Sequence, residues 1–427
     1  MSAALVGADG PRLDVARSRL PCGLEVAIHS DLTSPLVAVS VWYRVGASDE
    51  RAGTSGFAHL FEHLFKNSLH LAGRHHYTIL REHGVVGANA STSTERTAYH
   101  EVVPAAALEL ALWLESDRMG YFLPAVDQAR LRGQQDVVRA ERRQRYENAA
   151  YGPERFAAAA ALYPDGHPLR YLTIGRHEDI EAATLADVAA FYRTWYVPAN
   201  ATLVIAGGVE VAEAEAAVAR YFGTFPASVR PVRAVPPAGV TPGRTEVADA
   251  RARVRRLRWV WMGPADGDPA LHALELLAVA LTAPGVGPLW QALVYQRHLA
   301  TRVVMGVARG RLGSEVHLIV DLHAEADRDE VRVVLAQAVA SACASGVEPA
   351  RLARIVGRAE ASLWWRLEGT LARAEAIQHG LEHWGDPQGF VHELAALRAV
   401  STEATAAAAR AVLTEAGRIE IETVVAG

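Results

Sequence analysis

The chain has 427 residues, too many for one ordinary hydrophobic core, so two domains of roughly 200 residues are expected. Half of the residues are hydrophobic and 21% are charged, as in ordinary globular proteins. The formal net charge is −5 without a long basic or acidic run, which argues against nucleic acid or an anionic membrane as the partner.

The cysteines and the N-terminal residues bear on the compartment. Cys22 and Cys343 are isolated in the sequence, which argues against a disulfide framework. Residues 1–19 lack the apolar core of a signal peptide, and no stretch is long and apolar enough to span a membrane. We therefore expect a cytoplasmic enzyme, or a periplasmic one if an export signal has been removed.

The first half of the chain begins with predicted strands at 24–29 and 36–45, followed by a polar loop over 46–56. A helix is expected from Phe57, with Thr54 or Ser55 as its N-cap, and a shorter helix over 77–83. Two further strands are predicted at 87–94 and 97–103. The first of these is rich in small polar residues, which indicates an exposed sheet edge. Such an edge either pairs with an extended peptide or is simply the rim of a hairpin.

Helices dominate the rest of this half. They are predicted over 104–119, from Pro124 to about 148, and over 180–195 and 211–222, with an irregular segment at 151–171 and a strand at 202–207. Five prolines then punctuate residues 225–242, a composition typical of a linker. We predict a first domain at 1–225, a linker at 226–243 and a second domain at 244–427.

The second half repeats the order of strand, loop and helix. Strands are predicted at 254–262, 301–307, 315–323 and 419–425, and helices at 272–281, 289–297, 329–344 and 349–383. This order predicts a degenerate internal repeat and an α+β fold with two related domains. Each domain is expected to be a mostly antiparallel sheet packed with helices.

The chemistry centres on His59, Glu62 and His63, in the order His-x-x-Glu-His. On a helix the two histidines lie one turn apart on the same face and can bind one Zn²⁺, which also needs a third protein ligand and an open position. This order is the inverzincin signature. A single histidine on a helix is more often a surface or core residue. Three ionisable side chains within an apolar helix, however, are costly to bury unless a metal compensates them.

Glu141 is the best candidate for the third ligand, on a long helix whose other face is apolar. With it the set becomes His₂Glu, which is typical of catalytic zinc. Glu62 would then be the general base that accepts a proton from the zinc-bound water. The alternative for Glu141 alone is a solvated glutamate on a charged helix surface.

Five segments together resemble one known family, the M16 metallopeptidases, which include pitrilysin, insulin-degrading enzyme and the mitochondrial processing peptidase. In chain order the segments are GTSGFAHLFEH at 53–63, NASTSTERTAY at 89–99, LWLESDRM at 112–119, VVRAERRQRYEN at 137–148 and HPLRYLTIG at 167–175. They span nearly all of the first half, whereas the second half resembles the family mainly in layout. The length is similar to that of the short M16B members.

The resemblance implies a LuxS/M16 peptidase-like fold and one Zn²⁺ per chain, bound by His59, His63 and Glu141. It implies that Glu62 is the general base and that a substrate peptide pairs with the strand at Asn89 and Ala90. It further implies a clam-shaped dimer around a chamber that admits peptides and unfolded segments. The expected function is that of a zinc-dependent endopeptidase.

Two departures from the family pattern qualify this expectation. Gln134 replaces a second glutamate near the outer coordination sphere, which removes a charge. Active relatives also present an arginine and, seven residues later, a tyrosine to the scissile carbonyl, and here Val294 and Thr301 align with them. We expect a heterodimer in which a homologous chain supplies that pair, with a homodimer as the alternative. The alternative function is that of a non-catalytic M16-like core or assembly subunit.

Overall fold

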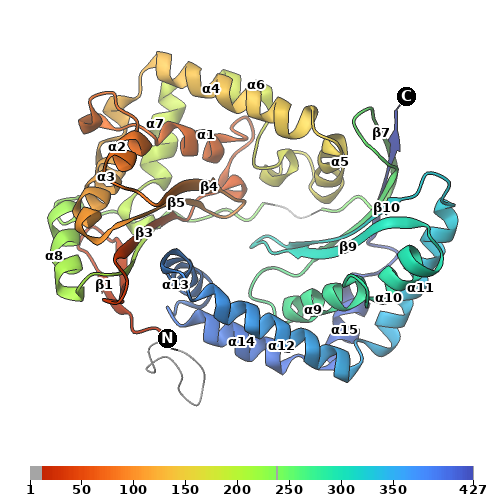
Figure 1. Cartoon of the computed structure of the whole chain (residues 1–427). Coiled ribbons are helices and arrows are strands. Elements are labelled where there is room, and N and C mark those ends of the chain that lie inside the picture. Colours follow the sequence, from red (N-terminus) through yellow and green to blue (C-terminus); the bar gives the residue numbers. More distant parts are fainter. Residues whose placement is uncertain (1–11, 237–238, 427) are drawn as a thin grey trace. The chain divides into compact units, whose positions relative to one another are not determined.

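Two sheets organise the chain in the computed structural model, which describes residues 12–236 and 239–426 (Figure 1). The contacts between elements group the chain into two units. The first contains residues 12–139, 173–234 and 362–393, and the second contains 140–172, the described part of 235–361, and 394–426. Each unit is a sheet packed with helices, so the predicted α+β class is confirmed.

The sheet of the first unit has the strand order β1-β2-β6-β3-β5-β4. Only β2 and β6 are parallel neighbours. Its strands are β1 (Ala16–Arg19), β2 (Glu25–Ser30), β3 (Leu36–Tyr43), β4 (Gly87–Thr92), β5 (Thr97–Pro104) and β6 (Ala201–Gly207). Every residue of β6 is buried, as expected for an apolar central strand, whereas β4 lies at the edge.

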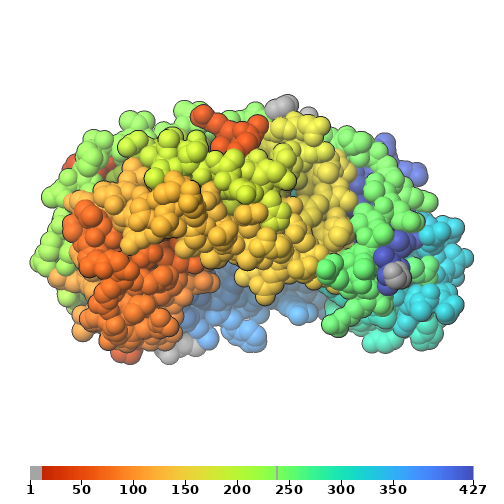
Figure 2. Space-filling model, turned by 90° about the horizontal axis from the view of Figure 1, so that it is seen from above, coloured from red at the N-terminus to blue at the C-terminus, as the bar shows by residue number. Residues whose placement is uncertain are grey.

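Helices cover both faces of this sheet. Helix α3 packs on β3 and β5, and α13 packs on β3 and β6 from the opposite side (Figure 1). The helices that lie mostly or wholly in this unit are α1 (Phe57–Leu64), α2 (His76–Glu82), α3 (Leu108–Tyr121), α4 (Gln128–Arg142), α6 (His177–Ala182), α7 (Leu185–Trp195), α8 (Val211–Phe222) and α13 (Thr370–Trp384). The exposed side of α4 is visible in gold in Figure 2.

The second unit repeats the topology of the first. Its sheet has the order β7-β11-β8-β10-β9, with only β7 and β11 parallel. The strands are β7 (Gly243–Asp249), β8 (Arg256–Gly263), β9 (Ala300–Ala308), β10 (Ser314–Leu322) and β11 (Ile419–Val425). Taken in chain order, β7 to β11 occupy the places of β2 to β6. The predicted internal repeat is therefore present in the sheet topology.

The core of the second unit is largely aliphatic, with Trp259 and Trp261 fully buried on β8. Its helices are α5 (Gly152–Leu162), α9 (Ala270–Thr282), α10 (Pro288–Trp290), α11 (Arg328–Ser345), α12 (Pro349–Arg366), α14 (Gly389–Ala399) and α15 (Thr402–Val412). In the part of the chain that the structure describes, no single helix is both long enough and apolar enough to cross a bilayer.

Each sheet is covered by a helix from the other half of the sequence. Helix α5 packs on β7 and β11, where the fully buried carboxylate of Glu154 accepts a hydrogen bond from Thr423 (2.8 Å) and pairs with Arg258. Helix α13 packs on β3 and β6, where Gln378 donates to the carbonyls of Ser40 (2.9 Å) and Thr202 (3.0 Å). The predicted division at residues 226–243 separates the strands of the two sheets along the chain. It does not separate the packed units, because α5 comes before the division but packs in the second unit, and α13 comes after it but packs in the first.

Some predicted elements were wrong. The segment 151–171, expected to be irregular, contains the helix α5. Pro153 stands in its first turn, where the missing amide hydrogen costs nothing, and a run of alanines follows. The single helix predicted over 349–383 is two helices, because Gly369 becomes the N-cap of α13. Likewise, the helix expected over 180–195 is α6 followed by α7.

Gln378 provides a test of the packing of α13. Replacing Gln378 with Met keeps the side-chain volume but removes both donated hydrogen bonds in a buried site. We expect the free energy of unfolding to fall by about 1–3 kcal/mol. Urea denaturation of the variant measures this, with the exposed Gln296→Met as the matched control. An equal effect of the two substitutions would contradict the assigned role of Gln378.

Candidate metal centre

Helix α1 carries the His-x-x-Glu-His motif, and its first turn is held by Glu50. Gly56 is the N-cap, with a positive φ of 85°, a backbone conformation that favours glycine. The buried Glu50 carboxylate accepts hydrogen bonds from the amides of Gly56 (2.8 Å) and Ala58 (2.9 Å). The predicted N-cap at Thr54 or Ser55 was therefore wrong, because an acidic side chain from outside the helix satisfies these amides. Burial raises the pKa of Glu50 well above its ordinary value, and the two backbone hydrogen bonds oppose this shift.

The segment at 173–176 packs tightly against the start of α1. A Cβ atom at Gly175 would lie 2.4 Å from the carbonyl oxygen of Ser55, so the close approach requires glycine. Ser55 donates from its backbone amide to Asp179 (3.2 Å) and accepts from the amide of Arg176 (3.0 Å). The entry of the chain into α1 is thus fixed from both sides.

An aromatic cluster holds the opposite side of α1. The ring of Phe61 stacks on Tyr196, with centroids 4.8 Å apart, and Phe57 contacts Phe191 at 5.8 Å. Phe57, Leu60 and Phe61 are almost fully buried, and burying each such side chain contributes about 1.5–3 kcal/mol. The apolar face of the helix is therefore fixed in the core, and the polar face is directed away from it.

The three predicted metal ligands come together at α1 and α4. Nε2 of His59 lies 3.3 Å from Nε2 of His63, and the ligand atoms of both histidines and Glu141 all lie within 4.8 Å of one another. Two nitrogens bound to one tetrahedral zinc at about 2.0–2.1 Å would be roughly 3.3–3.4 Å apart. The spacing of the histidines and the chemistry of the donor set both fit zinc.

Glu141 lies near the end of α4, and Arg145 contacts it. Arg145 stands one turn later, in a π-helical stretch over Arg143–Glu147, and its Nη1 is 2.8 Å from Oε1 of Glu141. Gln134 lies two turns before Glu141 and is half-buried, but its side chain forms no hydrogen bond with the residues that the structure describes. The predicted outer-sphere role of Gln134 remains a prediction.

Glu62 lies on α1 beside the edge strand β4. Its Oε2 accepts a hydrogen bond from Oγ1 of Thr92 at 2.8 Å, which orients the carboxylate. Asn89 is exposed and Ala90 is buried on the same strand, and β4 has a partner on only one side, β5. The predicted sheet edge is therefore confirmed, while peptide binding to it stays a prediction.

A second group of possible ligands lies in the interior, where Arg118 takes the place of a metal. Ligand atoms of His76, Glu101 and Glu115 lie within 4.8 Å of one another, and all three residues are about 1% exposed. Nη2 of Arg118, however, is 2.9 Å from both Nε2 of His76 and Oε1 of Glu115. The guanidinium group already supplies the positive charge, and full burial leaves no open position for water or substrate.

The two carboxyl groups of this interior cluster both have raised pKa values. Burial is the largest cause for Glu101, and the neighbouring Glu115 raises its pKa further. Burial also raises the pKa of Glu115, whereas the charge of Arg118 opposes that shift. We infer that Glu101 carries the proton and that Glu115 pairs with Arg118, because of these two carboxyl groups it is Glu115 that lies within ion-pair distance of the guanidinium group.

This assignment predicts the pH dependence of stability. A folded-state pKa above the unfolded value means that the folded chain binds more protons, so the contribution of Glu101 is present at low pH and is lost as the pH rises. Glu101→Gln removes this loss. Between about pH 5 and about pH 8, we expect the free energy of unfolding to fall less in Glu101→Gln than in the parent chain. Urea denaturation with excess chelator measures it, and the exposed Glu213→Gln should behave like the parent.

Three residues at the site were missed in the sequence. Thr92 stands in a run of serines and threonines, where nothing local distinguishes it, and Glu50 lies in a loop that was described only as polar. Arg145 follows Glu141 at the i+4 spacing of helical ion pairs, a signal that could have been used. Both aligned positions lie in the second unit. Val294 is half-buried in a π-helical stretch over Gln291–Gln296, and Thr301 is exposed on β9.

Two family profiles match the chain in succession. One, described as "Insulinase (Peptidase family M16)", matches residues 25–164, and "Peptidase M16 inactive domain" matches residues 182–358. Among curated proteins, "Zinc protease PqqE" of Helicobacter pylori is 34% identical over 191 residues, which are 44% of this chain and 42% of that protein. "Probable mitochondrial-processing peptidase subunit beta, mitochondrial" of Arabidopsis thaliana is 25% identical over 61% of this chain and 49% of its own length. These matches therefore cover less than half of each relative.

Solved structures match over nearly the whole chain. A protease from Helicobacter pylori superimposes with a TM-score of 0.87 at 22% identity, covering 96% of this chain and 99% of that one. The "peptidase M16 inactive domain" of Pseudomonas fluorescens gives a TM-score of 0.83 at 16% identity, with 96% and 98% covered. These likenesses establish the fold.

Proposed function

Because the chain belongs to the M16 peptidase family, whose two profiles together cover most of its length, we propose that it is a zinc-dependent endopeptidase of peptides and unfolded segments. The observation that carries the proposal is the convergence of His59, His63 and Glu141 beside the carboxylate of Glu62. The name "Zinc protease" of the Helicobacter pylori relative supports the same metal.

His59, His63 and Glu141 would hold one zinc ion. When bound, zinc supplies a Lewis acid that polarises the substrate carbonyl and acidifies a water molecule. The helix backbone presets the two imidazoles, so little side-chain ordering remains to be done on binding. The ion pair with Arg145 would lower the electron-donating ability of Glu141 and hold its carboxylate in position.

Glu62 is the proposed general base. Its carboxylate would accept the proton of the attacking water and later deliver it to the leaving amine nitrogen. The hydrogen bond from Thr92 occupies Oε2, which leaves Oε1 for the proton. Because Thr92 is the last residue of β4, the same strand that would bind the peptide also orients the base.

The edge of β4 is the proposed substrate strand. An extended peptide would add to it through main-chain hydrogen bonds near Asn89 and Ala90. Main-chain recognition is tolerant of sequence, which suits an enzyme for unfolded segments. A folded protein offers few free extended backbones and would be a poor substrate.

Glu62→Gln separates the enzyme from a non-catalytic scaffold. We expect the variant to retain stoichiometric zinc, since Glu62 is not a ligand, and to lose peptide cleavage by about 10²–10⁴-fold. Elemental analysis and cleavage of a quenched fluorescent peptide measure the two properties, with Glu213→Gln as the control. The alternative of an assembly subunit is kept because human "Cytochrome b-c1 complex subunit 1, mitochondrial", by name a subunit of a complex, is 26% identical over 212 residues. A zinc-loaded parent chain that cleaves nothing, even with its partner, would support that reading.

We also propose that the working enzyme is a heterodimer with a homologous M16 chain. By the family resemblance drawn from the sequence, Val294 and Thr301 align with an arginine and a tyrosine that stabilise the reacting carbonyl in active relatives. Neither replacement can supply the positive charge or the phenolic donor. The match to proteins named subunit beta, which by name work in a multi-subunit protein, is consistent with a separate partner.

The partner proposal predicts low activity for the isolated chain. Loss of oxyanion-type donors costs about 10²–10³ in rate, so the chain alone should cleave peptides that much more slowly than its complex with a homologue carrying Arg-x₆-Tyr. Purification of both forms and comparison of kcat at equal zinc content test this. Equal rates would show that this chain needs no donated pair.

A further inference from the structure

A cleft of about 390 Å³ at one end of the first sheet is lined by more arginines than carboxylates. Residues from the ends of β1, β2, β3 and β6 contribute to it, together with the segment 230–233 and the last turn of α13. The lining residues are Arg17, Arg19, Glu25, Arg44, Asn200, Arg230, Pro231, Arg233, Leu381, Glu382 and Gly385. Five arginines and two glutamates line the cleft, and Asp49 and Glu95 outside the lining contact Arg233, so the arginines still outnumber the carboxylates.

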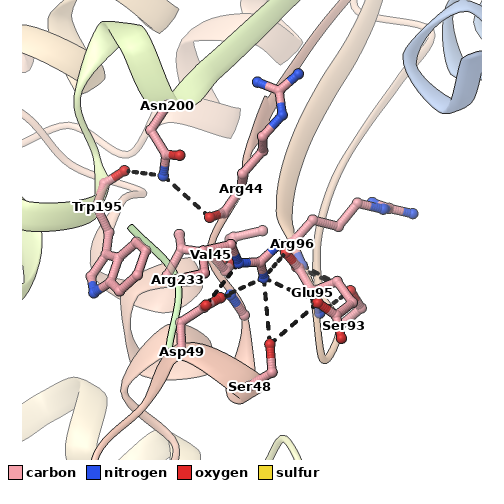
Figure 3. Close-up of polar contacts among 12 residues, drawn as sticks. Arg44, Val45, Ser48, Asp49, Ser93, Glu95, Arg96, Trp195, Asn200 and Arg233 are labelled. Atoms are coloured by element: carbon pink, nitrogen blue, oxygen red, sulfur yellow. Dashed lines mark hydrogen bonds and ion pairs between the residues drawn. The ribbon is translucent and has the colours of Figure 1, made fainter. Parts of the chain in front are cut away.

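Three of these arginines already have carboxylate partners. Arg233 pairs with Asp49 through two hydrogen bonds of 2.8 and 2.6 Å and approaches Glu95 at 3.1 Å (Figure 3). Arg17 contacts Glu25 at 2.8 Å, and Nε of Arg44 contacts Glu382 at 2.5 Å. These pairs build the wall of the cleft and leave little charge for a ligand.

Two arginines keep their charge largely uncompensated. Arg230 donates to the carbonyl of Ala199 (3.4 Å) and has no carboxylate within 4.0 Å among the described residues. Burial lowers the pKa of Arg230, and the nearby positive charge of Arg44 lowers it further. Arg19 reaches Glu25 only at 3.9 Å, and that carboxylate is shared with Arg17. Two neighbouring cations that are only weakly compensated by the shared carboxylate of Glu25 favour an added anion.

Arg44 adds a second, independent observation. It is 7% exposed, and its Nη1 has no hydrogen-bond acceptor among the residues that the structure describes. Figure 3 shows its guanidinium group directed away from the Asp49–Arg233 pair, while its carbonyl accepts a hydrogen bond from Asn200 at 3.2 Å. A buried donor without an acceptor costs about 1–3 kcal/mol, so a ligand oxygen near it would be stabilising.

We propose that this cleft binds a compact dianionic oxyanion of the phosphate class, either free or borne on a small molecule. Planar guanidinium groups match the paired oxygens of phosphate. Arg19 and Arg230 would contribute the charge, and the buried Nη1 of Arg44 would contribute a hydrogen-bond donor. The volume of the cleft exceeds that of one phosphate group and suits a diphosphate or a phosphate monoester. The inference is independent of the proposed zinc chemistry, because none of the lining residues belongs to the metal centre.

Calorimetric titration of the full chain tests the proposal, with inorganic phosphate, pyrophosphate, glycerol phosphate and succinate as ligands at constant ionic strength. We expect a phosphate-bearing ligand to bind and succinate, a dicarboxylate, to bind at least tenfold more weakly. Tighter binding of glycerol phosphate than of inorganic phosphate would indicate an ester ligand, and the reverse a free anion. Equal binding of succinate would overturn the phosphate assignment.

Variants show whether the cleft is the binding site. Arg230→Gln should weaken the binding about tenfold, and the double variant Arg19→Gln/Arg230→Gln should abolish it. The exposed Arg193→Gln on α7 is the matched control and should bind as the parent does. Pyrophosphate could also chelate zinc from the candidate metal centre. Because that heat would be the same in the parent and in every variant, it cannot account for weaker binding in the arginine variants alone. No binding to the parent chain, or equal binding to Arg230→Gln, would refute the site.

Discussion

The position of α1 depends on a buried carboxylate. The carboxyl oxygens of Glu50 accept hydrogen bonds from the backbone amides at the start of the helix, and the aromatic cluster around Phe61 packs against its opposite face. At about 100° per residue, His59, Glu62 and His63 project from the same side of α1. A rotation of the helix about its axis would therefore turn all three away from Glu141 together. A helix dipole favours a carboxylate at this end, which offsets part of the cost of burying Glu50.

The reliance on arginine shapes the interior. Lys66 is the only lysine, so nearly every internal cation is a guanidinium group, which stays charged when buried and offers several donors at fixed angles. Arg118 and Arg258 each neutralise a fully buried carboxylate in this way. The candidate metal centre differs from these clusters because its three possible ligands are two histidines and a glutamate, with no arginine among them. Arg145, which contacts Glu141, is largely exposed and stands outside the group.

Much of the site could be predicted from the sequence because its signals are local. The spacing of His59 and His63, the small polar residues of β4 and the apolar face of α4 each lie within one element. Contacts between distant residues could not be predicted. Gln378 is 338 positions from Ser40, and Glu154 is 269 positions from Thr423, so no local pattern relates the members of either pair. For the same reason the exchange of α5 and α13 between the two halves was not foreseen, although the strand order of both sheets was consistent with the predicted repeat.

That exchange has a consequence for synthesis of the protein on the ribosome. The strands of the first sheet are complete once Gly207 has been made, but the helix that covers β3 and β6 ends only at Trp384. For roughly 175 further residues, or about 10–35 seconds at elongation rates of about 5–20 residues per second, the face of the nascent sheet that α13 covers remains exposed. Apolar surface exposed in this way during translation favours aggregation until α13 has been made. The protein is also poorly suited to being split into two separately made domains.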